Sequence, residues 1–436
     1  MADLNISIIS DQASESNQAG WWHPLDSFQG VEYYGLCKEF GTTGRHQVEI
    51  VRRDADGTLT RGLCKNTDGT IAVFSNDVGH NQPSIVVDGE GYVHVFTSMH
   101  ANLLRYFRSS SPGDVTEMVD ATWNFPDVEW AWTYPIVGRA PNGDIYLMLR
   151  VSNRIATGET KRGAFVYKYS LSSHQWERFA HVAEQDAKSV YSQDIAVTST
   201  GVHLLFEWAK ALASGVRHGG AYGIIGFDGV MRDIAGVQAE MPVTQGQIAY
   251  KPIMPGENAN TNSGEVMGLQ CARFAFDSDG LSHIAYRYRD EDNIGGTAFG
   301  KFAVKLATWS GSEWVEEEIA YVPPDTGDTS ATIATSLIDG KKRVWFSVEY
   351  TSGGSVVAII VMAENDGTGW VYSVLGDSEP TLMRLSAVTV TDGNVLYVSA
   401  PFAGDGMGTV SRYFVPSDYS PVQGFSNFAD LLAALG

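Results

Sequence analysis

Five side chains that can do acid–base and charge-stabilising chemistry stand where runs of alternating β-forming residues begin or end: His80, His100, Tyr134, Arg150 and Tyr191. Histidine and tyrosine act as general acids and bases, and a fixed arginine stabilises negative charge that develops beside it. Single residues of these types are ordinary at strand ends. They form a candidate site only if the fold brings them together, so the elements that carry them come next.

Six segments repeat one pattern, in which two alternating runs flank a tight polar turn. They span 84–100, 136–150, 195–208, 272–288, 334–350 and 386–400, with turn glycines Gly91, Gly143, Gly201, Gly280, Gly340 and Gly393. Their spacing leaves room for one four-stranded blade each, and the strand-like region 20–76 supplies another. We therefore predict an all-β, seven-bladed β-propeller of four-stranded antiparallel blades. We expect one domain over residues 1–436, with the N-terminal blade (about 20–76) closing against the C-terminal strands.

A second repeated element is a polar turn that leads to a tryptophan, at Trp176, Trp314 and Trp370. These turns resemble, in weakened form, the Asp-box of bacterial neuraminidase-type propeller repeats. The simpler interpretation is a polar hairpin with a packed tryptophan. Helical periodicity occurs only in the C-terminal tail, NFADLLAALG.

The propeller geometry assigns each strand end to a face. The hairpins between the first two strands of every blade share one face, so the start of the first strand and the end of the second lie on the other. His80, Tyr134 and Tyr191 open first strands, and His100 and Arg150 close second strands, so we expect all five to converge. Residues expected to bind substrate on the same face are Asn81, Arg154, Trp208, Arg287 and Arg289. Trp123, Trp130 and Trp132 fit either a sugar-binding wall or packing between blades.

A histidine, tyrosine and arginine set suits β-elimination on a uronic acid. The C5 proton becomes acidic once a cation offsets the neighbouring carboxylate; a histidine or tyrosine removes it, and a tyrosine protonates the departing O4 oxygen. Tyrosine has an ordinary pKa near 10, so it needs a nearby cation to serve as a base. Glu207 and Asp194 form no recognisable carboxylate pair of the kind that glycoside hydrolysis needs.

One stretch resembles a known family. GHNQPSIVVDGEGYVHVFTSMHANLLRYFRSS, from Gly79, followed by TYP and LMLR, is similar to the seven-bladed propeller polysaccharide lyases that cleave ulvan, a sulfated rhamnose and uronic acid polymer. The resemblance implies endolytic polysaccharide degradation by a lyase secreted by a marine bacterium. By position, it also implies canyon histidines at His80 and His100, tyrosines at Tyr134 and Tyr191, and a carboxylate-facing arginine at Arg150. Which histidine is the base stays open.

Composition and charge exclude some classes of binding partner. With 30 basic and 51 acidic residues the formal charge is −21, so nucleic acid is excluded as a partner, and no apolar run is long enough to span a membrane. The first residues lack the basic start and apolar run of a secretory signal. We expect an extracellular or periplasmic monomer that binds an anionic, ulvan-like polysaccharide. The chemistry requires no cofactor, although His218 and Cys271 could hold a structural zinc ion.

Two other functions fit the same fold. One is a non-catalytic glycan-binding propeller, such as a lectin or phage adhesin. The other is a sialidase-type propeller glycoside hydrolase. Only a lyase leaves an unsaturated uronate, so that product separates the three hypotheses.

Overall fold

The computed structural model describes the chain except at residues 1–2, 18, 42–43, 76–77, 155–161, 211–216, 253–268, 279, 289–302, 322–328, 353–354, 381–382, 401–406 and 436. In the described part, nearly all regular structure is β-strand. The helices there are α1 (Phe428–Leu435) and the 3-10 turns η1 (Ala19–Trp21), η2 (Val78–His80) and η3 (Thr122–Asn124). None of these described helices has the length and apolar character to cross a membrane. The prediction of an all-β chain with a helical tail is confirmed.

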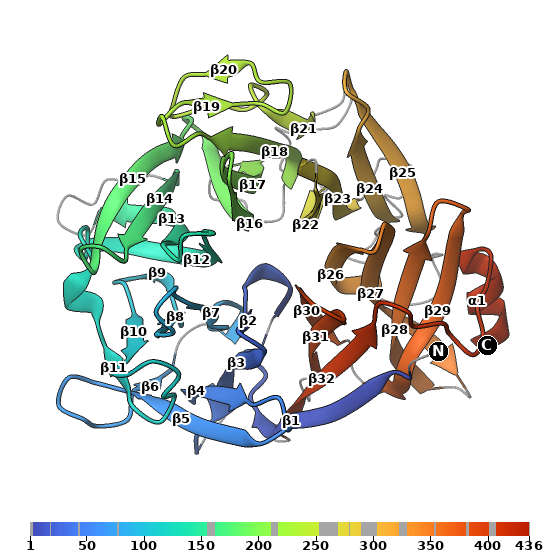
Figure 1. The fold of residues 1–436 in the computed structure, drawn as a ribbon, viewed down its shortest axis with the longest axis horizontal. Coiled ribbons are helices and arrows are strands. Elements are labelled where there is room, and N and C mark those ends of the chain that lie inside the picture. Colours follow the sequence, from blue (N-terminus) through green and yellow to red (C-terminus); the bar gives the residue numbers. More distant parts are fainter. Residues whose placement is uncertain are drawn as a thin grey trace.

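Mostly antiparallel sheets stand in a ring around a central axis, as in β-propellers (Figure 1). One sheet contains β12 (Trp130–Arg139), β13 (Ile145–Arg154), β14 (Ala164–Ser170) and β15 (Gln175–Ala183), with β9 (His100–Asn102) beside β12. The next contains β16 (Lys188–Thr198), β17 (Gly201–Lys210), β18 (Arg217–Ile225), β19 (Met231–Arg232), β20 (Gln238–Ala239) and β21 (Ala249–Lys251). Two four-stranded sheets follow, β22 (Leu269–Asp277), β23 (Gly280–Tyr288), β24 (Ala303–Trp309) and β25 (Trp314–Tyr321), then β26 (Thr329–Ile338), β27 (Lys341–Ser352), β28 (Ser355–Asn365) and β29 (Trp370–Glu379).

The remaining strands form one continuous sheet that joins the two ends of the chain. It runs from β30 (Arg384–Val390), β31 (Gly393–Ala400) and β32 (Gly408–Pro416) through β1 (Asn5–Ala13) to β3 (Val31–Glu39), β4 (His46–Arg53) and β5 (Leu59–Lys65). It continues through β11 (Met118–Asp120), β10 (Tyr106–Ser109) and β8 (Val93–Phe96) to β7 (Ser84–Val87), while β2 (Leu25–Phe28) and β6 (Val73–Phe74) pair at the side. The N-terminal strand β1 pairs along β32, so the ring is closed by strands from opposite ends of the sequence.

An ion pair strengthens this closure. Arg412 on β32 donates two hydrogen bonds of 2.7 Å to the carboxylate of Glu32 on β3, and both side chains are nearly buried. A buried charge pair of this kind is costly to break from one side, because the remaining ion would lose its partner.

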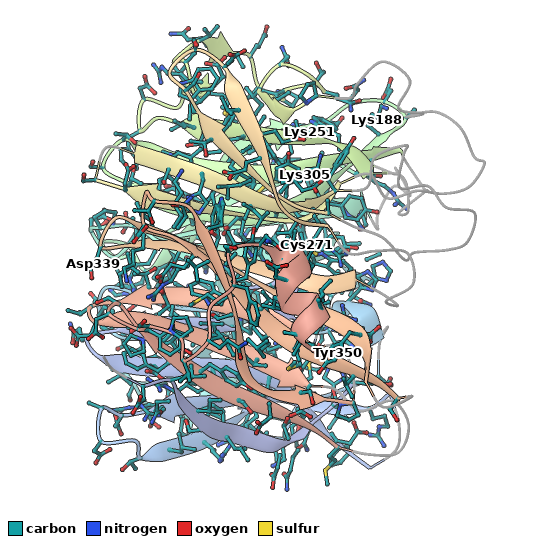
Figure 2. All side chains as sticks on the ribbon, turned by 90° about the vertical axis from the view of Figure 1, so that its right-hand side faces the viewer. Lys188, Lys251, Cys271, Lys305, Asp339 and Tyr350 are labelled. Atoms are coloured by element: carbon teal, nitrogen blue, oxygen red, sulfur yellow. The ribbon has the colours of Figure 1, made fainter. Side chains whose placement is uncertain are left out.

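The first hairpin turns of successive blades meet closely on one face. The Gly89 amide donates to the Gly143 carbonyl at 3.0 Å, and a Cβ on Gly143 would lie 2.5 Å from the Gly89 Cα. Because Gly143 also has φ of +89°, only glycine fits there. Asp339, in the equivalent turn between β26 and β27, lies at one edge of the molecule, and Lys188, at the start of β16, lies at the opposite edge (Figure 2). The first strands therefore run from one face to the other.

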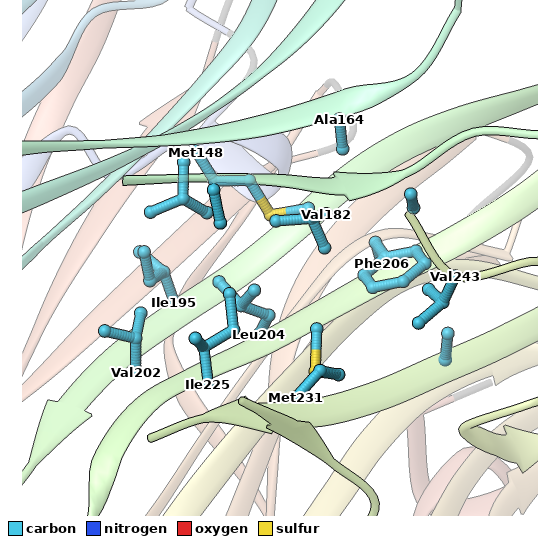
Figure 3. Close-up of a cluster of buried hydrophobic side chains, with 14 of the residues drawn as sticks. Met148, Ala164, Val182, Ile195, Val202, Leu204, Phe206, Ile225, Met231 and Val243 are labelled. Atoms are coloured by element: carbon cyan, nitrogen blue, oxygen red, sulfur yellow. The ribbon is translucent and has the colours of Figure 1, made fainter. Parts of the chain in front are cut away.

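Apolar side chains fill the spaces between neighbouring sheets. Figure 3 shows one such cluster, with Met148 of β13 and Ile195 of β16 among the side chains that meet. Trp176 packs edge-on against Phe96 and Tyr106 of the preceding sheet, and Trp314 packs against Tyr222 in the same way. The tryptophans of the second repeat are thus packing residues between blades.

Candidate active site

The two predicted histidines stack on each other at one mouth of the axis. His80 ends η2 and His100 begins β9; their ring centroids lie 3.7 Å apart and the rings are nearly parallel. A hydrogen bond of 3.0 Å joins His80 Nε2 to the hydroxyl of Tyr134. The structure therefore places three of the five predicted residues in direct contact.

A β-bulge in β12 sets the orientation of the Tyr134 side chain. The register between β12 and β13 shifts after Thr133, which pairs with both Arg150 and His100, and Tyr134 adopts φ of +56°. A left-handed conformation is rare for an aromatic residue and costs energy, and such outliers cluster at functional sites. Bulges next to active sites turn a side chain away from its expected face. Cys271 has the same feature, φ of +55°, at a register shift in β22.

Arg150 lies between the two predicted tyrosines. Its guanidinium carbon is 4.6 Å from the ring centroid of Tyr134 and 4.7 Å from that of Tyr191, and the two rings are 5.2 Å apart. The arginine is only 3% exposed, yet its Nε and Nη1 atoms have no hydrogen-bond partner in the described part of the chain. Leaving a buried cation without an anion is expensive, so this arrangement is suited to binding an anionic group.

A second arginine near this group was not predicted. Arg162 is half-buried, and its carbonyl accepts a hydrogen bond of 2.9 Å from the amide of Val190, next to Tyr191. Burial, followed by the like charge of Arg150, lowers the pKa of Arg162. Arg162 lies between two strands rather than at a repeat position, so register could not identify it.

The floor of the site comes from the N-terminal segment, which sequence reasoning also missed. Trp22 is fully buried, and its ring contacts Tyr134 and His80, with centroid distances of 5.9 and 6.4 Å. Arg273 on β22 donates to the carbonyl of Gly20 at 2.7 Å and to that of Trp22 at 3.4 Å. The only sequence signal was the Trp-Trp-His run at positions 21–23, which no repeat contains.

Beneath this floor lies a separate space on the axis. His23 bridges the carbonyl of Val137, at 2.8 Å, and the carboxylate of Asp194, at 2.9 Å. A cavity of about 420 Å³ continues from there, lined by β2, β7, β12, β16, β22, β26 and β30. Asp194 faces this cavity and also accepts the backbone amides of Ile195 and Phe274. The described partners of Asp194 are therefore His23 and two backbone amides, and not the stacked histidines.

The residues expected to bind substrate have different surroundings. Asn81 is fully buried and donates to the hydroxyl of Ser16, so it supports the scaffold. Trp208 is 2% exposed and packs in the core against Phe206, because β17 continues past it and alternation turns it between the sheets. Arg287 is also nearly buried on β23.

Three of the predicted residues fall at or beyond the limits of the description. The backbone of Arg154 ends β13, opposite Trp130, but its side chain lies outside the described residues, as does all of Arg289. The side chain of His218 is likewise outside them, and Cys271 is buried. The described residues contain no group of three or more His, Cys, Asp or Glu side chains that could hold a metal ion, and zinc stays a prediction.

The three tryptophans proposed either to line a sugar-binding wall or to pack between blades have different environments. Trp130 and Trp132 are buried between the sheets, whereas Trp123 on η3 is 76% exposed. Asn124 anchors η3 to the turn at His174, on the outer side of the ring. Packing between blades is thus the role of Trp130 and Trp132.

Comparison with known proteins agrees with this class of fold. A sequence model described as "BNR repeat-containing family member" matches residues 31–321, and the chain belongs to that family. An ulvan lyase from Nonlabens ulvanivorans is 22% identical over 361 residues, which cover 72% of this chain and 71% of that protein. The resemblance to ulvan lyases drawn from the sequence is confirmed.

Solved structures agree over almost the whole chain. A PL25 ulvan lyase bound to -[GlcA(1-4)Rha3S]- has a TM-score of 0.66 at 16% identity, covering 98% of this chain and 99% of the other. A second polysaccharide lyase has a TM-score of 0.61 at 12% identity, covering 95% and 99%. These likenesses establish the fold, and with the sequence relative they support the predicted class of polysaccharide lyase.

Proposed function

We propose that this protein is a polysaccharide lyase that cleaves an ulvan-like polymer by β-elimination at C4 of a uronate. The observation that carries the proposal is Arg150, a buried guanidinium held between two tyrosines with unused hydrogen-bond donors. A uronate carboxylate is the anion that fits: it is planar, it accepts two parallel hydrogen bonds, and its C5 neighbour is the atom to be deprotonated.

The chemistry follows from the contacts around that anion. With the carboxylate on Arg150, charge that develops as the C5 proton leaves is stabilised by a fixed cation. The C5–H electrons form the C4=C5 double bond, and the C4–O bond breaks. The departing oxygen takes a proton from a tyrosine, and the hydrogen bond between Tyr134 and His80 provides a route to restore it.

The stacked histidines suit divided roles. Two imidazolium rings with centroids 3.7 Å apart would repel strongly, so at most one of the two is charged, and we propose a pair with one charged and one neutral ring. A charged ring helps Arg150 to neutralise the carboxylate, and a neutral ring accepts the C5 proton. We propose these two roles for His80 and His100 without assigning which ring takes which. No step requires a metal ion or cofactor.

The relatives support the choice of substrate. The curated relative is an ulvan lyase, and a similar structure holds a chain of glucuronate and 3-sulfated rhamnose. We propose the same substrate class here, an alternating polymer of uronate and sulfated sugar. Since such a polymer is met outside the cell, we propose a secreted protein, and one that acts as a monomer.

The architecture in this proposal is one seven-bladed propeller. The strands that line the axial cavity would each be the first strand of a blade, and the continuous sheet would comprise three blades joined at their edges. Pairing of β1 with β32 supports treating the chain as a single closed domain.

A single assay separates this function from binding or hydrolysis. The full chain is incubated with ulvan, alginate, pectate and glycosaminoglycans while ultraviolet absorbance of the new C4=C5 double bond is followed. We expect absorbance to rise with ulvan. Chain shortening without absorbance would indicate a hydrolase, and tight binding without either change would indicate a glycan-binding propeller.

A further inference from the structure

Two arginines near the candidate site, Arg150 and Arg162, have guanidinium atoms that donate to no described partner's oxygen. The chain carries 30 basic against 51 acidic residues, so acceptors for arginine are abundant. Arginines in the body of the sheets use them: Arg412 pairs with Glu32 (2.7 Å), Arg343 with Glu364 (2.7 Å) and Arg178 with Asp127 (2.6 Å). Arg150 Nε and Nη1 and Arg162 Nε, like Nε and Nη2 of Arg108, are buried without a hydrogen-bond partner among the described residues.

Backbone contacts fix Arg162 close to the reacting groups. Its carbonyl accepts the amide of Val190 at 2.9 Å, and the carbonyl of the next residue, Gly163, accepts the amide of Val151 at 3.0 Å. Arg162 is therefore pinned between the strand that carries Tyr191 and the strand that carries Arg150. The lowered pKa of Arg162, caused by burial and by Arg150, agrees with two cations facing the same space.

The two arginines differ in their distance from bulk solvent. Arg150 is 3% exposed and is enclosed by the tyrosine rings, so its anion belongs to the sugar that reacts. Arg162 is half-buried, at the edge of the same group. An anion on the adjoining sugar would lie at that edge.

We infer that Arg162 binds the sulfate ester of the sugar next to the uronate, and so makes this site selective for a sulfated polymer. The inference rests on the proposed function, which supplies a carboxylate and a sulfate on neighbouring residues. Guanidinium groups bind oxyanions through paired, charge-assisted hydrogen bonds, which suits sulfate as well as carboxylate. One cation for each anion then balances the charge in the occupied site.

The test compares Arg162→Gln with the unmodified protein on native ulvan and on chemically desulfated ulvan. On native ulvan we expect kcat/KM to fall about 10- to 100-fold, mainly through KM, because a charged hydrogen bond is lost. On desulfated ulvan the two proteins should agree within about twofold, since the contact is absent from both. Arg232→Gln, which changes an exposed arginine paired with Asp228 far from the site, should leave both polymers unaffected.

Other outcomes of the Arg162→Gln experiment would contradict the role of Arg162 or the proposed function. An equal loss on both polymers, or no loss on either, overturns the role of Arg162 while leaving the lyase intact. If the unmodified protein cleaves neither polymer, the proposed function fails and this inference fails with it. Should Arg162→Gln melt well below the unmodified protein, Arg162→Lys keeps the charge without the paired donors and gives the same comparison.

Discussion

Histidines lie both inside the sheets and at the mouth of the axis, and their surroundings differ. Inside, His94 bonds to Asp88 at 3.0 Å and to Tyr106 at 2.7 Å, and His203 bonds to Tyr222 at 2.6 Å. At the mouth, His80 and His100 stack face to face, and His80 Nε2 also bonds to the Tyr134 hydroxyl at 3.0 Å. His94 and His203 have both ring nitrogens occupied by fixed partners, which suits a scaffold. The mouth rings contact another titratable ring, which suits proton transfer.

Burial also fixes the charge of two interior histidines. It lowers the pKa of His203 to about 4 and that of His283 to about 3, so both rings are neutral at ordinary pH. Such groups contribute to stability by staying unprotonated. The same residue type is thus used for structure in one region and, in our proposal, for chemistry in the other, and position in the repeat decides which.

The largest effect is expected from Arg150. Replacing Arg150 with alanine should lower turnover of ulvan by about 10³-fold or more, because the carboxylate would lose its fixed cation. The matched control is Arg178→Ala, which also removes an arginine over aromatic rings, Trp130 and Phe165, but one already paired with Asp127. Steady-state rates and melting temperatures are measured for both. A large melting loss in the Arg150 variant with normal activity per folded molecule would make Arg150 structural.

Substitution of the histidines tests most directly whether the mouth and interior rings have different roles. His80→Asn and His100→Asn should each lower kcat by about 10²- to 10⁴-fold, the usual contribution of a positioned acid or base, with little change in melting temperature. His203→Asn should do the reverse, because it removes a buried partner of Tyr222. If the His203 variant loses activity without losing stability, the division between the two regions is wrong.

The tyrosine hydroxyls give a smaller effect. We expect Tyr134→Phe to lower kcat by about 10²-fold and to shift the pH profile, since the partner of His80 Nε2 is removed. Tyr191→Phe tests the alternative acid, and Tyr222→Phe, an interior tyrosine bonded to His203, is the control. Full activity in both site variants would mean that the proton comes from another group.

Stability should fall as the pH falls from about 6.5 towards 4. The folded pKa values of His203 and His283 lie below the unfolded value, so the unfolded chain binds more protons in that window and is favoured there. The loss is roughly 3 kcal/mol for His203 and roughly 5 kcal/mol for His283 once the pH is below the folded pKa of each, which for His283 is reached only near pH 3. Urea unfolding at several pH values measures this, and His203→Gln should flatten the dependence. An unchanged slope would assign the acid sensitivity to other groups.

The sequence identified the repeats and, through them, the positions of the main site residues. Register brought His80 and Arg150 to one end of the axis because it depends only on alternation and turn position. Register could not predict side chains at departures from regular alternation. A bulge sets the orientation of Tyr134, and Trp208 lies in the core because its strand continues past it. Trp22 lies outside every repeat, so only the folded chain could place it.

The floor made by the N-terminal segment determines how a long polymer can be handled. Trp22 is buried and Arg273 donates to its carbonyl, and both Arg273 and His23, the residue after Trp22, line the cavity. In the proposed function, a sugar chain bound on this floor would lie across the ring rather than pass through it, so binding would need no free chain end. Cleavage would then begin anywhere along the polymer, and early products would be long fragments rather than single disaccharides.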